Sequence, residues 1–221
     1  MFYETIKNDH GLPYNPFKSC VVPRPIGWIS TISLDGVPNL APYSQFQNLS
    51  FDPPYVMFAA NQKTDGSRKD SVVNAEQSGE FVHNMVTYEL REAVNISAQE
   101  VPPDVDEFEL AGLGKAPSKM VKPYRVEESP VQFECRYYQT LRLPGKSTMG
   151  SVDIVIGQVI GIHIKDEFIR RDGKLDILKM RPIARLGYYD YTCVESVFQM
   201  VIPGPNEEIR AGMEGVRGRW F

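Results

Sequence analysis

The stretch that decides the fold is residues 24–54, which read R-P-I-G-W-I-S-T-I-S-L-D-G-V-P-N-L-A-P-Y-S-Q-F-Q-N-L-S-F-D-P-P. Apolar residues alternate with small hydroxyl residues over 26–34, which predicts a strand. Asp35-Gly36 then predicts a hairpin turn. Beyond the turn, Pro42 removes one backbone donor from an irregular polar stretch. We therefore expect a strand edge with free N–H and C=O groups beside hydroxyl side chains, which suits a flat heteroaromatic ring with hydrogen-bonding edges.

This segment resembles the flavin reductase-like family, the FMN-binding split barrels. The residues that carry the resemblance are Gly27–Ser33, Gly36, Asn39–Ser44, Phe46 and Ser50–Pro54. The strand, turn, loop and D-P-P exit come in the family's order, and the likeness extends over roughly residues 20–190. The resemblance implies a mainly β fold with a few helices, an FMN-binding split β-barrel that often dimerises.

Composition places the chain among ordinary soluble globular proteins, with 221 residues, 42% hydrophobic and 24% charged. We expect one split-barrel domain over residues 1–194 and a C-terminal extension over 195–221. The net charge of −4 gives no reason to expect nucleic acid or an anionic membrane as a partner. We find no signal-peptide pattern and no membrane-spanning run, and the three widely spaced cysteines favour reduced thiols in the cytoplasm.

Periodicity over the rest of the chain predicts many strands and few helices, which favours a barrel over a doubly wound α/β fold. A helix near 68–78 has Ser67 as its expected cap and ends at Gly79. A second helix has Thr87 as its expected cap. The further predicted elements are strands near 43–50, 55–60, 80–86, 131–143, 152–164 and 183–188, and a short helix over 105–111.

The polar stretch before the first helix predicts a phosphate site. Arg68 and Lys69 lie at a helix N-terminus, which is already electropositive and favours acids. A bound anion would remove that conflict, because free N–H groups, the helix dipole and flanking cations together bind phosphate. By resemblance, the FMN phosphate is assigned to Ser67, Arg68, Lys69 and Ser71, with Lys63 nearby. The alternative is a solvated helix start that caps itself.

The resemblance also assigns contacts to the flavin ring, many of them through backbone atoms. The residues are Ser30, Thr31, Ala41, Ser44, Gln45, Phe46 and Asn48. The alternatives are a half-exposed strand face for Thr31 and core packing for Phe46 and Trp28, which we favour for Trp28. The three histidines match no metal-binding spacing, so we expect no metal site.

A flavin carries its own redox chemistry, so we expect no catalytic side chain. The resemblance implies NAD(P)H:flavin reductase activity, with a hydride passing from NADH or NADPH to the flavin N5. In the A-R-L-G-Y-Y element, Arg185 stands where shorter reductases of this kind have a histidine, and the chain looks more like the flavoredoxin-like branch. The alternatives are a non-catalytic FMN protein that passes electrons to a partner, and a barrel used only for protein contact. A homodimer is expected by resemblance.

Overall fold

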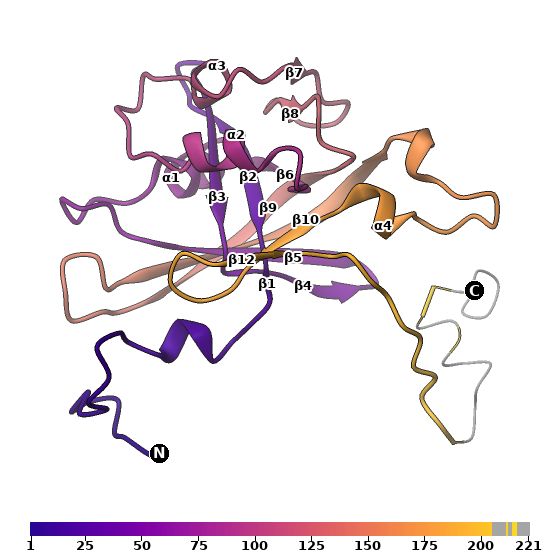
Figure 1. The fold of residues 1–221 in the computed structure, drawn as a ribbon. Coiled ribbons are helices and arrows are strands. Elements are labelled where there is room, and N and C mark those ends of the chain that lie inside the picture. The colour runs from indigo at the N-terminus through magenta and orange to yellow at the C-terminus, as the bar shows by residue number, and fades with distance from the viewer. Residues whose placement is uncertain (205–210, 212–213, 216–221) are drawn as a thin grey trace.

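The computed structural model describes residues 1–204, 211, 214 and 215. Its main element is one antiparallel sheet of seven strands in the order β3-β2-β6-β9-β10-β5-β4 (Figure 1). The strands are β2 (Gly27–Ile32), β3 (Pro38–Tyr43), β4 (Phe46–Phe51), β5 (Pro54–Asn61), β6 (Glu80–Asn84), β9 (Val131–Leu143) and β10 (Val152–Ile164).

The two edge strands of this sheet, β3 and β4, follow one another in the chain. The Ala59 N–H on β5 donates to the Gln45 carbonyl (2.8 Å), which extends the β4–β5 pairing by one residue beyond Phe46. The barrel is therefore not closed by strand pairing but stays split between β3 and β4. The predicted mainly β split barrel is confirmed.

Two small sheets flank the barrel. One joins β1 (Arg24–Pro25) to β11 (Ile183–Arg185) and β12 (Tyr191–Cys193), with Arg24 opposite Arg185. The other pairs β7 (Lys115–Ala116) with β8 (Arg125–Val126). The first of these sheets brings residues near the end of the expected domain against the start of the motif 24–54.

The helices α1 (Asp70–Ser78), α2 (Arg91–Ile96) and α3 (Glu107–Leu110) lie together at the top of Figure 1, beside the β2, β3 and β6 part of the sheet. The structure also has the short α4 (Ile177–Met180) and the 3-10 turns η1 (Phe17–Ser19) and η2 (Asp166–Phe168). α1 ends at Gly79 in the left-handed conformation (φ 74°), as predicted.

The two predicted helix caps are wrong. The N-cap of α1 is Lys69, without a side-chain hydrogen bond, because Ser67 instead donates to Asp65. The N-cap of α2 is Leu90, because Thr87 forms a bridge with Pro182. Both hydroxyl residues lie before the first helical turn and have other partners.

The long strands β9 and β10 have the predicted bounds, because sustained alternation and flanking turn residues define both ends. Between the hairpin turn and β5 the prediction is wrong in detail. The strand expected over 43–50 is β4, at 46–51, and a separate strand β3 precedes it. The helix expected over 105–111 is a single turn, α3.

The interior holds two apolar clusters. One lies inside the barrel around Phe58, Phe81 and Val155, with Phe46 packed against it. The other lies under α2 and α3 around Trp28, Leu40 and Phe108. Core packing of Trp28 is confirmed, because it is fully buried and its indole donates to Ser97 Oγ (2.9 Å).

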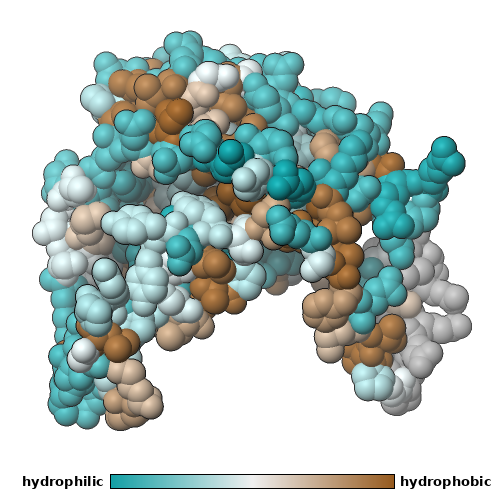
Figure 2. Space-filling model, viewed as in Figure 1, coloured by the Kyte–Doolittle hydropathy of each residue, from teal (hydrophilic) through white to brown (hydrophobic). Residues whose placement is uncertain are grey.

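The two ends of the described chain leave the body on opposite sides of a hollow (Figure 2). Residues 1–23 form an N-terminal arm that carries exposed apolar side chains such as Phe2 and Ile6. Residues 194–204 form neither helix nor strand, and the aromatic end of the expected C-terminal extension, Trp220 and Phe221, lies outside the described residues. Within the described part of the chain, no helix is long and apolar enough to cross a membrane.

Candidate functional site

The outer edge of β3 presents carbonyl groups rather than free N–H groups. The Leu40 N–H points away from β2 and donates to Glu107 (2.9 Å). Because backbone groups alternate in direction along a strand, the N–H positions of residues 38 and 42 also point away from β2. Pro38 and Pro42 have no N–H to offer. The expectation of free N–H groups along this edge is therefore wrong for β3, where the open groups are hydrogen-bond acceptors.

A buried polar network fixes β3 to the helices above it. Asn39 donates to Glu107 (2.8 Å) and accepts from the hydroxyls of Ser71 (2.7 Å) and Thr31 (3.3 Å). Asn74 of α1 donates to Thr31 (3.2 Å). Burial raises the pKa of the Glu107 carboxyl, against the lowering effect of its hydrogen bonds. The hydroxyls of Thr31 and Ser71 are thus engaged inside the protein.

The cations that are expected to bind a phosphate form ion pairs with carboxylates of the same chain. Lys63 pairs with Asp70 (2.8 Å) and Lys69 with Glu100 (2.9 Å). Arg68 binds Glu76 through both terminal nitrogens (2.6 and 2.7 Å) and reaches the buried Asp153 through Nε (3.0 Å). The Glu76 hydrogen bonds are the main reason that the pKa of Arg68 is raised. Arg68 therefore acts as a structural link between α1 and the barrel.

Two cavities lie along β3 and share Pro42 and Ala98. The smaller one, of about 70 Å³, lies beside the N-terminus of α1. Its lining includes Ala41, Lys63, Lys69 and Ser71, together with the carboxylates of Asp70, Glu100 and Glu107. The larger cavity, of about 710 Å³, extends from Ser44 to the N-terminal arm and the β11–β12 turn.

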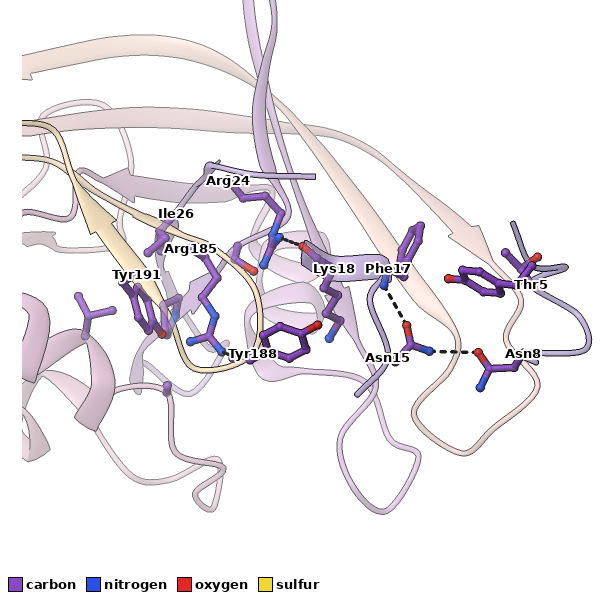
Figure 3. Close-up of a pocket in the computed structure, with 15 residues that line it drawn as sticks. Thr5, Asn8, Asn15, Phe17, Lys18, Arg24, Ile26, Arg185, Tyr188 and Tyr191 are labelled. Carbon is purple, nitrogen blue, oxygen red and sulfur yellow. Dashed lines mark hydrogen bonds between the residues drawn. The ribbon is translucent and has the colours of Figure 1, made fainter. Parts of the chain in front are cut away.

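Among the described residues, the larger cavity is lined by three cations, Lys18, Arg24 and Arg185, and by no carboxylate (Figure 3). Arg24 donates to the carbonyls of Val21 (2.7 Å), Leu186 (2.6 Å) and Lys18 and so joins the arm to the β11–β12 turn. The Arg185 guanidinium lies 4.4 Å from the centre of the Tyr191 ring and donates to the Tyr188 carbonyl. Positive charge and exposed tyrosine rings make this cavity suited to a planar anionic molecule.

Of the twelve predicted site residues, five line these two cavities: Ala41, Ser44, Lys63, Lys69 and Ser71. Seven line neither: Ser30, Thr31, Gln45, Phe46, Asn48, Ser67 and Arg68. Ser30 is fully buried and donates to the Tyr124 carbonyl, whereas Asn48 is exposed on β4 and accepts from Gln47 (2.8 Å).

Sequence reasoning missed the contribution of Lys18, Tyr188 and Tyr191 to the larger cavity. The available signals were Arg24 at the start of the motif and Arg185 in the A-R-L-G-Y-Y element, but no local pattern places these two residues opposite each other. Among the described residues, no group of three or more His, Cys, Asp or Glu side chains is placed to hold a metal ion.

The model of the flavin reductase like domain matches residues 19–190. The chain belongs to this family. An uncharacterized protein of Aquifex aeolicus is 40% identical over 171 residues, which cover 76% of this chain and 84% of that one. Nitrilotriacetate monooxygenase component B from Bacillus cereus has a similar structure, with a TM-score of 0.82 and 27% identity over 90% of this chain and 98% of its own.

The flavoredoxin of Desulfovibrio vulgaris (Miyazaki F) shares the fold, with a TM-score of 0.71 and 17% identity over 84% of this flavin reductase-like chain and 94% of its own. Both structures support the split-barrel assignment. The resemblance on residues 24–54 and its extent over roughly 20–190 are confirmed by the family match.

Proposed function

We propose that this protein is an FMN-binding oxidoreductase of the NAD(P)H:flavin reductase type. The observation that carries the proposal is the cavity of about 710 Å³ between the carbonyl edge of β3 and the β11–β12 turn, which has three cations and no acids in its lining. Cavities of roughly 300–1,000 Å³ are the usual size of small-molecule and cofactor sites. The larger cavity therefore suits a flavin ring in size and in its hydrogen-bonding edge, and its positive charge suits the phosphates of a second nucleotide.

The residues would divide the cofactor between the two cavities. Carbonyls on the outer edge of β3 accept hydrogen bonds, so they suit an N–H group on a ring. Lys63 and Lys69 would supply donors for the phosphate at the smaller cavity, which Ser71 also lines, beside the N-terminus of α1. Lys18 and Arg185 supply positive charge in the larger cavity for the phosphates of a nicotinamide nucleotide.

When bound, the flavin would supply the redox chemistry by accepting a hydride equivalent from NADH or NADPH. The protein groups then bind and orient the two rings, and no side chain is required as a nucleophile or general base. The other contacts assigned by resemblance stay predictions. They are the ring contacts of Ser30, Thr31, Gln45, Phe46 and Asn48 and the phosphate contacts of Ser67 and Arg68.

A test begins with the visible absorbance of freshly purified protein. The proposal predicts a yellow flavin spectrum, or binding of added FMN, followed by FMN-dependent oxidation of NADH or NADPH. Tight FMN binding with slow NAD(P)H oxidation would favour the second candidate, a flavoredoxin-like electron-transfer protein with a partner protein as acceptor. That candidate rests on Arg185, which replaces the family's histidine. A colourless protein that ignores FMN would contradict both.

We also propose a cytoplasmic homodimer. The outward face of the β9–β10 ribbon carries apolar side chains, with Leu141 opposite Ile154 and Leu143 opposite Val152. Leu141 and Leu143 are each about half exposed. Contiguous exposed apolar surface of this kind marks association sites. Three free cysteines fit a reducing compartment.

A further inference from the structure

The Glu100 carboxylate accepts hydrogen bonds from three donor groups beside the N-terminus of α1. The Thr64 N–H and Thr64 Oγ1 donate to Glu100 Oε1 (3.1 and 2.7 Å), and Lys69 Nζ donates to Glu100 Oε2 (2.9 Å). Glu100 belongs to the segment that follows α2, whereas Thr64 and Lys69 belong to the loop that leads into α1. A distant acid is thus bound by the loop expected to hold a phosphate.

These donors are the set that a phosphate needs. A backbone N–H, a hydroxyl and an ammonium group near a helix N-terminus bind anionic oxygens through short charge-assisted hydrogen bonds. No side chain caps the N-terminus of α1, because its N-cap residue is Lys69, which makes no side-chain cap hydrogen bond. The Glu100 carboxylate takes the place that a phosphate oxygen would take.

We propose that Glu100 is an internal competitor of the flavin phosphate, and that it must leave Thr64 and Lys69 before the phosphate can bind there. This inference rests on the proposed function, because it takes the smaller cavity as the phosphate end of the FMN site. Its consequence is that the chain lowers its own affinity for phosphorylated flavin, so the cofactor exchanges rather than staying bound between turnovers.

Glu100 can move away from its hydrogen-bond donors more easily than Glu107, the buried acid at this cavity. Its side chain is 32% exposed, and it follows α2 in a segment that forms neither helix nor strand. A displaced Glu100 carboxylate would therefore reach water. Glu107 is only 4% exposed and holds both Asn39 and Leu40, so its departure would open the β3 network.

Mild acid would not release Glu100. The Thr64 hydroxyl, the Lys69 ammonium and the Thr64 N–H lower the pKa of Glu100 to about 2. The carboxylate therefore stays charged at any pH at which the enzyme would be assayed. Displacement requires a competing anion rather than a change of pH.

The test compares Glu100→Gln with a matched control, Glu92→Gln. Both changes remove one negative charge, but Glu92 lies on α2 with 77% of its side chain exposed, and among the described residues it forms an ion pair only with the neighbouring Arg91 (3.5 Å). Each apoprotein is titrated with FMN and with riboflavin at fixed ionic strength. The comparison distinguishes the contribution of the phosphate to binding from that of the ring. Riboflavin has the same ring without the phosphate.

We expect Glu100→Gln to tighten FMN binding about tenfold, which is the effect of a charged hydrogen bond discounted for partial exposure. Riboflavin binding, and both flavins on Glu92→Gln, should change by less than about twofold. A second measurement needs no flavin. The amide resonance of Thr64 should shift at a lower concentration of inorganic phosphate in Glu100→Gln than in the wild type.

Three results would overturn the inference. They are unchanged or weaker FMN binding by Glu100→Gln, an equal gain for riboflavin, and an equal gain from Glu92→Gln. Weaker binding would mean that Glu100 orders the donors instead of competing for them. If wild type and both variants all ignore FMN and riboflavin, the proposed function itself fails, which is a distinguishable outcome.

Discussion

Gly27 on β2 is a position where one added carbon has a clear structural consequence. A Cβ at Gly27 would lie 2.4 Å from Phe46 Cδ2 and 2.8 Å from Phe46 Cγ. The Phe46 ring is held from another side by His83, with which it stacks at 4.3 Å between ring centres. Gly27→Ala must therefore push the ring out of the apolar cluster inside the barrel, because neither neighbour leaves it room.

The size of the effect follows from the packing. Forcing an extra carbon into a filled core costs about 1–3 kcal/mol. Full loss of a buried phenyl ring, at about 3–5 kcal/mol, is the upper bound. We expect Gly27→Ala to lower the free energy of unfolding by about 2 kcal/mol, which for a chain of this length lowers Tm by about 4–8 °C.

Urea unfolding of a double-mutant cycle tests the cause as well as the size. In the Phe46→Ala background the new methyl group has space, so the cost of Gly27→Ala should fall below about 0.5 kcal/mol. Gly161→Ala on β10 is the control, because its nearest neighbour, Met120 Sδ, lies at an ordinary 3.4 Å. Equal destabilisation by Gly27→Ala in both backgrounds, or none in the wild type, would refute the argument.

Three further predictions concern stability and assembly. Arg68→Ala removes the Nε contact to Asp153, whose side chain is 1% exposed. Urea unfolding should show a free energy of unfolding lower by about 3 kcal/mol. A loss below about 1 kcal/mol would show that Asp153 is stable in the interior without Arg68. Burial lowers the pKa of His83 to about 3, so as pH falls below 6.5 the unfolded chain binds a proton that the native chain does not, and stability falls. His83→Phe should flatten that decline between pH 6.5 and 5 in urea titrations, and a parallel decline in the variant would contradict it. Leu141→Asp should convert a dimer to a monomer in light scattering, while Leu110→Asp, on α3, should not; a monomeric wild type would remove the basis of the proposal.

Local pattern was sufficient for the long strands and insufficient for β3. Residues 131–143 and 152–164 alternate over their whole length, so their bounds can be read from sequence. Around Pro42 we expect an irregular polar stretch instead. In the structure Pro38 and Pro42 stand at positions whose N–H would point away from β2, where a missing donor costs no ladder hydrogen bond. The sequence carries no signal for which side of a strand will be an edge.

The same limit applies to the site. The loop before α1 was recognised as cationic, but its partners come from far along the chain: Glu100 for Lys69 and Asp153 for Arg68. A pattern of neighbouring residues shows which groups are present, whereas tertiary contacts decide which of them are free. Arg68 is already committed to the barrel.

The two cavities differ in the charge of their lining residues, which no local sequence pattern predicts. The smaller cavity has two lysines and three carboxylates, so its lining has no excess of positive charge. The larger cavity has three cations and no acid, drawn from the N-terminal arm, the start of the motif and β11. A net charge of −4 for the whole chain describes neither. An anion that spans both cavities therefore meets open positive charge in the larger cavity. In the smaller cavity it meets donors that already bind Glu100. Removal of the Glu100 charge should therefore strengthen anion binding at the smaller cavity and leave anion binding at the larger cavity unchanged.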